Sequence, residues 1–137
     1  MKQTGSILIV DDAEFIRSII ARMVKREGYT VSEACDGVEA LEKLAVAPVD
    51  FVISDIKMPR MDGLELLGEI KSNYPDVMVL MITGYAGEYT SDDVLAAGAD
   101  YFITKPFKNV EIARTLVALK TKQQQQKAKA ARAAAKK

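Results

Sequence analysis

Acidic, hydroxyl and basic side chains directly follow four apolar runs of the chain. Asp11-Asp12 follow ILIV, Asp55 follows FVIS, Thr83-Gly84 follow VMVLMI, and Lys105-Pro106 follow YFIT. A short apolar run bounded by polar residues is typical of a buried strand in a parallel sheet. The carboxyl ends of parallel strands meet at one edge, where such folds bind their ligands, so these residues are candidates for a single site.

The candidate site would bring three carboxylates together, those of Asp11, Asp12 and Asp55. Carboxylates this close repel one another unless a cation joins them. The chain has no histidine and one cysteine, Cys35, which we interpret as structural, so the candidate ligands are hard oxygens. Oxygen ligands indicate Mg²⁺, which commonly shares its coordination shell with phosphate.

A phosphoryl group is therefore the expected ligand of this site. Its oxygens could be bound by the Thr83 hydroxyl, the Gly84 backbone N–H and the Lys105 ammonium group. Each residue also has a structural interpretation. Asp12 could only cap a helix, Asp55 could be a loop acid, and Thr83 and Lys105 could be ordinary strand and surface residues. Together these interpretations would require every unusual polar residue to reach one edge by accident.

Five apolar runs alternate with segments of helical periodicity. We predict strands at residues 6–10, 30–34, 51–54, 77–82 and 101–104. Asp36, Asp62 and Ser91 are predicted helix N-caps, Asn109 is predicted to open the last helix, and Gly28 is a predicted C-terminal cap. Strands that alternate with helices predict an α/β fold, a doubly wound parallel sheet with helices on both faces.

Length and composition indicate one globular domain with one hydrophobic core. No apolar run approaches the roughly 20 residues of a membrane helix, and the N-terminus lacks a secretory signal, so we expect a cytoplasmic location. Residues 1–119 contain twelve basic and nineteen acidic side chains, a formal charge of −7. Residues 120–137 contain seven basic and no acidic side chains. An acidic body argues against nucleic-acid binding by the whole domain.

The segments ILIVDD, FVISDIKMPRMDG, MITG and GADYFITKPF, in that order, resemble the receiver domain of two-component response regulators, which include the chemotaxis response regulator. The resemblance covers the chain to about residue 119 and implies a flavodoxin-like sheet of order 2-1-3-4-5. Residues 120–137 would form a basic tail that either continues the last helix or is disordered.

The resemblance implies that Asp55 is the phosphoacceptor. Mg²⁺ would be bound by the carboxylates of Asp11, Asp12 and Asp55 and by the backbone carbonyl of Lys57. Lys105 would neutralise charge on the transferred phosphoryl group. On this basis the protein is a signalling domain that catalyses only its own phosphorylation and dephosphorylation.

The resemblance also identifies two switch residues, Thr83 and Phe102. The family most often has tyrosine at the position of Phe102, and a phenylalanine has no hydroxyl to satisfy when it turns inward, so we expect it to favour the buried orientation. An exposed Phe102 in an activated structure would contradict this hypothesis. Tyr101 is expected to be ordinary strand packing.

The resemblance also implies roles for Lys57, Tyr85 and Pro106. Lys57 and Tyr85 match the positions that tune phosphoryl lifetime, and their size predicts shielding from water and slow dephosphorylation. The Lys105–Pro106 bond matches the family's cis peptide, which would aim the Lys105 ammonium group at the phosphate.

Two other classes of protein share parts of this pattern. A phosphohydrolase of the haloacid dehalogenase type would need a second acid two residues after its nucleophile, where this chain has Lys57. A nucleotide-binding module would need a glycine-rich loop after the first strand, which is missing. A receiver fold that works as a phosphorylation-independent adaptor remains open.

The partners implied are a sensor histidine kinase or a histidine phosphotransfer protein. With no DNA-binding output domain in the chain, we expect a stand-alone receiver in a phosphorelay. Its output partner would bind the face of the fourth helix, fifth strand and fifth helix, which could also support a phosphorylation-dependent homodimer. The basic tail could bind an acidic partner, nucleic acid or an anionic membrane.

Overall fold

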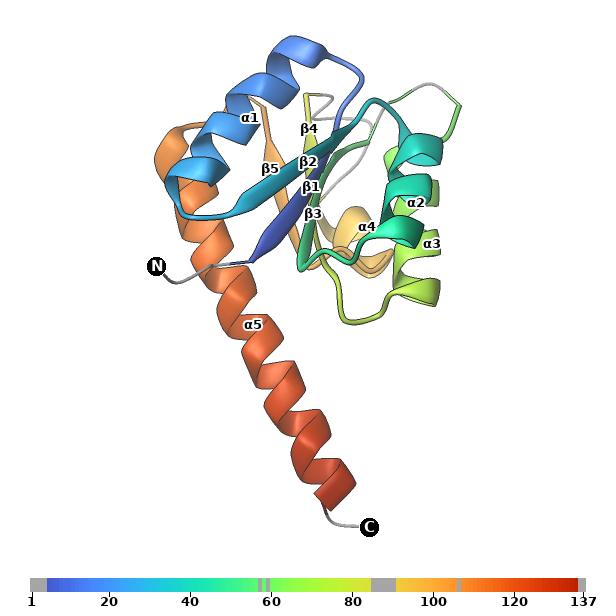
Figure 1. The fold of residues 1–137 in the computed structure, drawn as a ribbon, viewed down its shortest axis with the longest axis vertical. Helices are drawn as coiled ribbons and strands as arrows, with labels where there is room; N and C mark the ends of the chain where they lie inside the picture. The colour runs from blue at the N-terminus through green and yellow to red at the C-terminus, as the bar shows by residue number, and fades with distance from the viewer. Residues whose placement is uncertain (1–4, 57, 59, 85–90, 106, 136–137) are drawn as a thin grey trace.

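The computed structural model describes residues 5–56, 58, 60–84, 91–105 and 107–135, which form a sheet between two layers of helices (Figure 1). The elements are β1 (Ser6–Val10), α1 (Glu14–Arg26), β2 (Thr30–Ala34), α2 (Gly37–Val46), β3 (Phe51–Asp55), α3 (Gly63–Asn73), β4 (Met78–Thr83), α4 (Ser91–Ala96), β5 (Tyr101–Thr104) and α5 (Asn109–Ala135). Their strands pair in parallel in the order β2-β1-β3-β4-β5. The predicted fold class and strand order are confirmed.

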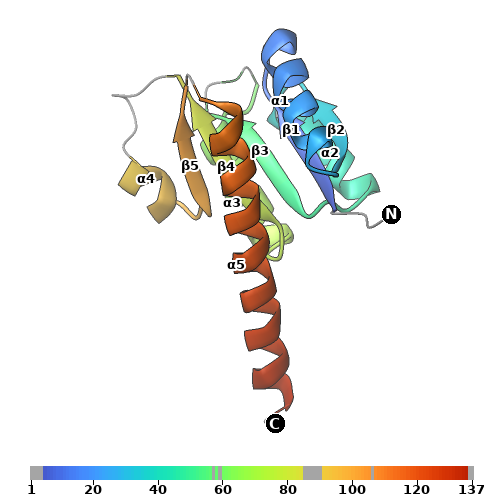
Figure 2. The same ribbon diagram turned by 90° about the vertical axis from the view of Figure 1, so that its left-hand side faces the viewer.

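Helices cover both faces of the sheet. One core cluster joins the strands to α1 and α5 through side chains such as Ile20, Val24 and Leu116. The other joins the strands to α2, α3 and α4, with Leu67 and Val94 among its members. Figures 1 and 2 show the same division, with α1 and α5 on one side of the sheet. Among the described residues, no helix combines the length and apolarity needed to cross a bilayer.

Local signals begin α2 and α3 and end α1 where the sequence predicted, whereas Ser91, predicted as an N-cap, is the first residue of α4. The Asp36 and Asp62 carboxylates accept hydrogen bonds from the backbone N–H groups of Glu39 and Glu65, at 2.9 and 2.8 Å, and so cap α2 and α3. Gly28 has a φ of 95° just after α1, a left-handed conformation that glycine adopts without strain.

Two strands differ by one residue from the predicted bounds: β3 at its carboxyl end, and β4 at both ends, since it begins at Met78. β3 continues to Asp55, which pairs in register with Ile82 of β4, and β4 itself ends at Thr83. Asp55 is therefore the last residue of a strand and is not a loop acid. Its backbone is fixed by the sheet.

The last helix, α5, continues to Ala135 and is anchored at the amino end of the sheet. The Gln123 side chain is 8 % exposed. Its Nε2 donates to the carbonyl oxygens of Asp50 and Asp76, at 3.2 and 3.1 Å. Asp50 lies just before β3 and Asp76 just before β4. Figure 2 shows the C-terminal part of α5 extending away from the body of the domain.

Asp100, just before β5, links three elements at the same end of the sheet. Its Oδ2 accepts hydrogen bonds from Lys71 Nζ at 2.7 Å and from the Val79 N–H at 2.8 Å. Its Oδ1 lies 2.9 Å from Lys122 Nζ on α5. Burial alone would raise the pKa of Asp100, but these donors together hold the pKa below its ordinary value.

We expect Asp100→Asn to lower the free energy of unfolding by roughly 2 kcal/mol at pH 7, since hydrogen bonds to charged groups are worth about 1.5–3 kcal/mol. The amide would still accept from Val79 but would lose the charge that attracts both lysines. Urea unfolding measures the difference, with Asp76→Asn, an exposed carboxylate nearby, as the matched control.

The same variant has a predicted pH dependence. A lowered folded-state pKa stabilises the protein fully above the ordinary carboxyl pKa of about 3.9, and this stabilisation is lost as the pH falls through the folded-state pKa. The difference in free energy of unfolding between wild type and Asp100→Asn should therefore be constant from pH 7 to about pH 5 and should decrease below about pH 4. If Asp100→Asn lowered the free energy of unfolding at pH 7 no more than Asp76→Asn does, the proposed role of the Asp100 charge would be contradicted.

Candidate functional site

Three carboxylates converge at the carboxyl edge of the sheet. Asp11 follows β1, Asp12 is next to it, and Asp55 ends β3. One carboxylate oxygen from each lies within 4.8 Å of the other two. Asp11 is 2 % and Asp55 7 % exposed, while Asp12 faces solvent. Two buried acids and one exposed acid therefore share a small volume.

Backbone contacts hold the acidic turn after β1. The Asp11 N–H donates to the Ala34 carbonyl at 3.2 Å, and Asp11 Oδ1 accepts from the Ala13 N–H at 2.9 Å. Ala13 occupies the N-cap position of α1 without a side-chain cap. The alternative in which Asp12 only caps this helix is therefore wrong.

Arg17, which the sequence did not single out, also supports this turn. Its guanidinium donates to the Asp11 carbonyl at 2.7 Å and to Glu33 Oε1 at 3.2 Å. The arginine therefore ties α1 to the end of β1 and to β2. A basic residue one turn into the helix after an acidic pair is the only signal in the sequence that could have pointed to it.

The Asp55 carboxylate is held by donors on both oxygens. Oδ1 accepts from the Ile56 N–H at 2.7 Å, and Oδ2 lies 3.3 Å from Lys105 Nζ. Burial raises the pKa of Asp55, the Lys105 ammonium group opposes this, and the Asp11 carboxylate adds to the increase, with a net rise. The ionised form of Asp55 therefore depends on nearby positive charge.

Lys105 provides that charge from the end of β5. Its Nζ lies 3.2 Å from Asp11 Oδ2 and 3.3 Å from Asp55 Oδ2. Burial would lower the pKa of Lys105, but the Asp55 and Asp11 carboxylates outweigh burial and raise it. The backbone N–H of Lys105 donates to the Thr83 carbonyl at 2.7 Å, which fixes the base of the side chain beside β4.

A hard divalent cation fits this set of donors. Three carboxylates and one ammonium group leave an excess of negative charge at the site, and two of the carboxylates are removed from water. The cluster contains only carboxylate oxygens and no nitrogen or sulfur ligand. This donor chemistry matches the predicted Mg²⁺.

Two of the remaining described candidates, Thr83 and Gly84, lie beside Lys105. Thr83 is fully buried as the last residue of β4, and Gly84 is exposed next to it. A Cβ at Gly84 would lie 3.6 Å from Lys105 Cδ, an ordinary van der Waals contact, so Gly84 lies against the Lys105 side chain. Phe102 is partly buried against the cluster formed with α2, α3 and α4. Tyr101 is 43 % exposed, more than the ordinary strand packing expected for it.

Lys57, Tyr85 and Pro106 lie outside the described residues. The expected metal-binding carbonyl of Lys57, the effects of Lys57 and Tyr85 on phosphoryl lifetime, and the cis peptide at Pro106 therefore stay predictions from the sequence.

The loop after Asp55 is held against α2. Arg60 has a φ of 66°, and its guanidinium donates to the Asp36 carboxylate at 2.8 and 3.0 Å. The hydrogen bonds from Arg60 hold the pKa of Asp36 below its ordinary value. The sequence predicted Asp36 only as a helix cap. Its ion pair with Arg60 joins positions 24 residues apart, which local patterns do not show.

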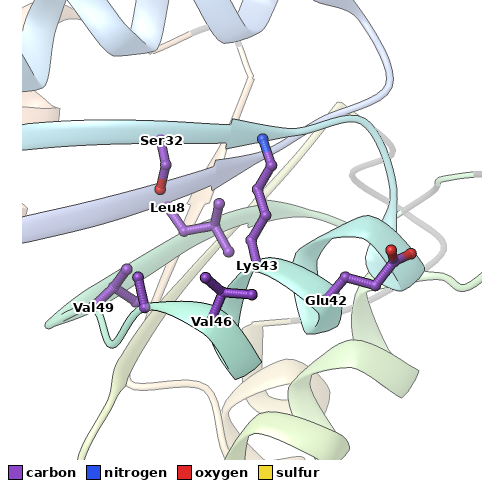
Figure 3. A pocket seen from close by; sticks show the side chains of 7 residues that line it. Leu8, Ser32, Glu42, Lys43, Val46 and Val49 are labelled. Carbon is purple, nitrogen blue, oxygen red and sulfur yellow. The ribbon is translucent and has the colours of Figure 1, made fainter.

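Apart from the acidic site, a hollow lies between α2 and the strands β1 and β2. Figure 3 shows Leu8, Val46 and Val49 converging on it. Its other lining residues are Ser32, Glu42, Lys43 and Ala47, and Glu42 points away from it. The hollow is mainly aliphatic and contains none of the converging carboxylates, so it does not compete with the acidic site.

Comparison with known proteins decides the family. The family model of the response regulator receiver domain matches residues 7–117. The chain belongs to the receiver domain family. The resemblance inferred from the sequence is confirmed, and the haloacid dehalogenase and nucleotide-binding alternatives are wrong. The receiver is a signalling module and not a conventional enzyme.

Curated relatives of this receiver are longer proteins. It is 41 % identical over 115 residues to the response regulator MprA of Mycobacterium ulcerans (strain Agy99), covering 82 % of this chain and 49 % of the relative. It is 36 % identical over 122 residues to the sensor kinase CckA of Brucella abortus (strain 2308), covering 88 % of this chain and 13 % of the kinase. The receiver thus spans half of these relatives or less.

Solved structures of similar length share the fold. A CheY-like receiver domain protein from Methanospirillum hungatei JF-1 has a TM-score of 0.82 at 33 % identity, over 88 % of this chain and 97 % of that one. The chemotaxis protein CheY4 of Vibrio cholerae has a TM-score of 0.77 at 33 % identity, over 84 % of this chain and 98 % of that one.

Gly63 permits the close approach of α3 to the end of β3, and we expect Gly63→Ala to disrupt it. A Cβ at Gly63 would lie 2.1 Å from the Asp55 carbonyl oxygen and 2.8 Å from Ile56 Cα, both backbone atoms. Overpacking of this kind typically costs 1–3 kcal/mol of stability. We therefore expect Gly63→Ala to lower the free energy of unfolding, measured with urea, by at least about 2 kcal/mol.

Gly68→Ala is the matched control on the same helix. A Cβ there meets nothing within 4 Å, so the higher helix propensity of alanine should raise stability by about 0.5–1 kcal/mol. Equal effects of the two substitutions would contradict the claim that Gly63 is required by contact with the Asp55 backbone.

Proposed function

We propose that this receiver accepts a phosphoryl group on Asp55 in a reaction that requires Mg²⁺. The donor is a phosphohistidine of a sensor histidine kinase or of a histidine phosphotransfer protein. The modification switches the binding of a partner in a two-component phosphorelay. The position of Asp55 supports this reaction most directly. Its carboxylate is buried at the end of β3 and faces both Lys105 and the acidic pair. Receivers as a family are partnered by histidine kinases.

The nucleophile in this reaction is the Asp55 carboxylate. A carboxylate oxygen attacks phosphorus, the new O–P bond forms, and the P–N bond to the donor histidine breaks with its electron pair left on the imidazole nitrogen. An ionised carboxylate carries no proton to remove, so no general base is required. The hydrogen bond from the Ile56 N–H orients the carboxylate before the attack.

Charge neutralisation is the main catalytic requirement, because phosphoryl transfer spreads negative charge over three equatorial oxygens. The Lys105 ammonium group, already beside Asp55, is placed to bind one of them. Mg²⁺ bound by Asp11, Asp12, Asp55 and the Lys57 carbonyl would supply further positive charge. The Thr83 hydroxyl and the Gly84 N–H are the proposed donors to the remaining oxygens.

The proposed switch runs through β4 and β5. Thr83 ends β4, and Phe102 pairs in register with Met81 of the same strand. Movement of Thr83 toward the phosphoryl group would free space for the Phe102 ring. Fully buried packing around β4 favours two discrete arrangements over gradual deformation.

The proposed output surface is the face of α4, β5 and α5. Each of these elements carries an exposed apolar side chain, with Leu95 42 %, Tyr101 43 % and Val110 47 % exposed. Exposed apolar residues on adjacent elements favour a protein partner, or a phosphorylation-dependent second copy. We further propose that Lys57 and Tyr85 shield the acyl phosphate and make dephosphorylation slow.

We expect incubation with acetyl phosphate and Mg²⁺ to add one phosphoryl increment to the intact mass of the wild type. Asp55→Asn should show none, because the amide is not a nucleophile for this transfer. EDTA should abolish the increment in the wild type. Asp76→Asn, an exposed carboxylate away from the site, is the matched control and should be modified like the wild type.

An increment that persists in Asp55→Asn would place the phosphoryl group on another residue and contradict the proposal. The absence of any increment in folded wild type, with a phosphorylated kinase domain as well as acetyl phosphate, would indicate the phosphorylation-independent adaptor.

A further inference from the structure

The end of α5 carries positive charge that the receiver chemistry does not use. Every side chain from Gln124 to Ala133 is exposed. This segment contains Lys127, Lys129 and Arg132 and no acid, and two more lysines follow at positions 136 and 137. Alanine, glutamine, lysine and arginine are strong helix formers, which accounts for a helix without a packing partner.

The base of this segment is fixed to the body of the domain. Gln123 is buried and bonds the carbonyl oxygens of Asp50 and Asp76, and Lys122 pairs with Asp100. The exposed part of the helix therefore leaves the domain in a defined direction, as Figures 1 and 2 show. We refer to residues 124–135 as the basic rod.

The length of the rod decides whether the acidic body cancels its charge. At 1.5 Å per residue, Arg132 lies about 13 Å along the helix beyond Gln123. The Debye length at physiological ionic strength is about 8 Å, so the negative charge of the body is largely screened at Arg132. The rod can thus attract a polyanion although residues 1–119 carry a formal charge of −7.

We propose that the basic rod is a nucleic-acid-binding element that lies in the major groove of duplex DNA without reading its sequence. Successive helix residues are rotated by about 100°, so Lys127 and Lys129 are about 200° apart and point to nearly opposite sides. Arg132 is about 60° from Lys129. A helix with cations on two sides can contact the phosphates on both walls of a groove that admits one α-helix.

Other occupants fit the rod less well. An interfacial membrane helix needs large apolar side chains opposite its charges, whereas the largest apolar side chain from Gln124 to Ala135 is alanine. Helix pairing in a coiled coil also needs apolar residues of larger size. The phosphate backbone requires only cations at suitable spacing, and small alanines let the helix approach closely.

Fluorescence anisotropy of the full chain with two labelled duplexes of unrelated sequence, each of roughly 20 base pairs, tests this proposal. We expect similar affinities for both and a slope of log K against log salt of about −3 to −4.5, from three to five phosphate contacts. The variant Lys127→Gln, Lys129→Gln, Arg132→Gln should bind at least about tenfold more weakly at about 50 mM salt and reduce the slope by about 2.7.

The matched control neutralises three exposed cations of α1, with Arg22→Gln, Lys25→Gln, Arg26→Gln. It makes the same change in net charge and should bind like the wild type. Asp55→Asn should also bind like the wild type, so a failure of phosphorylation and a failure of this inference are distinguishable.

Equal losses in the rod and control variants would overturn the proposal, because net charge alone would then set the affinity. Absence of duplex binding at about 50 mM salt would also overturn it. So would binding to vesicles containing phosphatidylserine without binding to either duplex, which would assign the rod to a membrane surface.

Discussion

Repulsion between carboxylates at one edge of the sheet is the constraint on which the rest of this receiver depends. Carboxylate oxygens of Asp11, Asp12 and Asp55 lie within 4.8 Å of one another. The Lys105 ammonium group pairs with both buried acids, Asp11 and Asp55. One ammonium group leaves the site short of positive charge. A divalent cation bound by the three carboxylates would relieve that shortage. The crowding of the acids therefore accounts for the proposed metal requirement of the site.

The fold places these charges by fixing backbone rather than by packing the side chains themselves. Asp55 is held by the register of β3 with β4, and Lys105 by its N–H bond to the Thr83 carbonyl. Gly63 lets α3 begin directly against the Asp55 backbone. The opposite end of the sheet is secured separately, by Asp100 and Gln123, so α5 can extend from the domain without disturbing the site.

The sequence was sufficient for the sheet and the acidic cluster because both depend on local patterns, apolar runs that end in polar residues. It was insufficient for pairings between distant positions. Arg17 with Glu33, Arg60 with Asp36, and Gln123 with two loop carbonyls join residues 16 to 73 positions apart. The exposure of Tyr101 was missed because alternation along β5 gives the face of the sheet on which a side chain lies but not how completely that face is covered.

Reductive trapping of the phosphorylated chain would identify the phosphorylated residue. Borohydride converts an aspartyl phosphate to homoserine, and peptide mass mapping then identifies the modified position. We expect a single conversion, at Asp55, that requires Mg²⁺ during phosphorylation. Conversion at Asp11, Asp12 or any other carboxylate would contradict the assignment of Asp55 as the nucleophile.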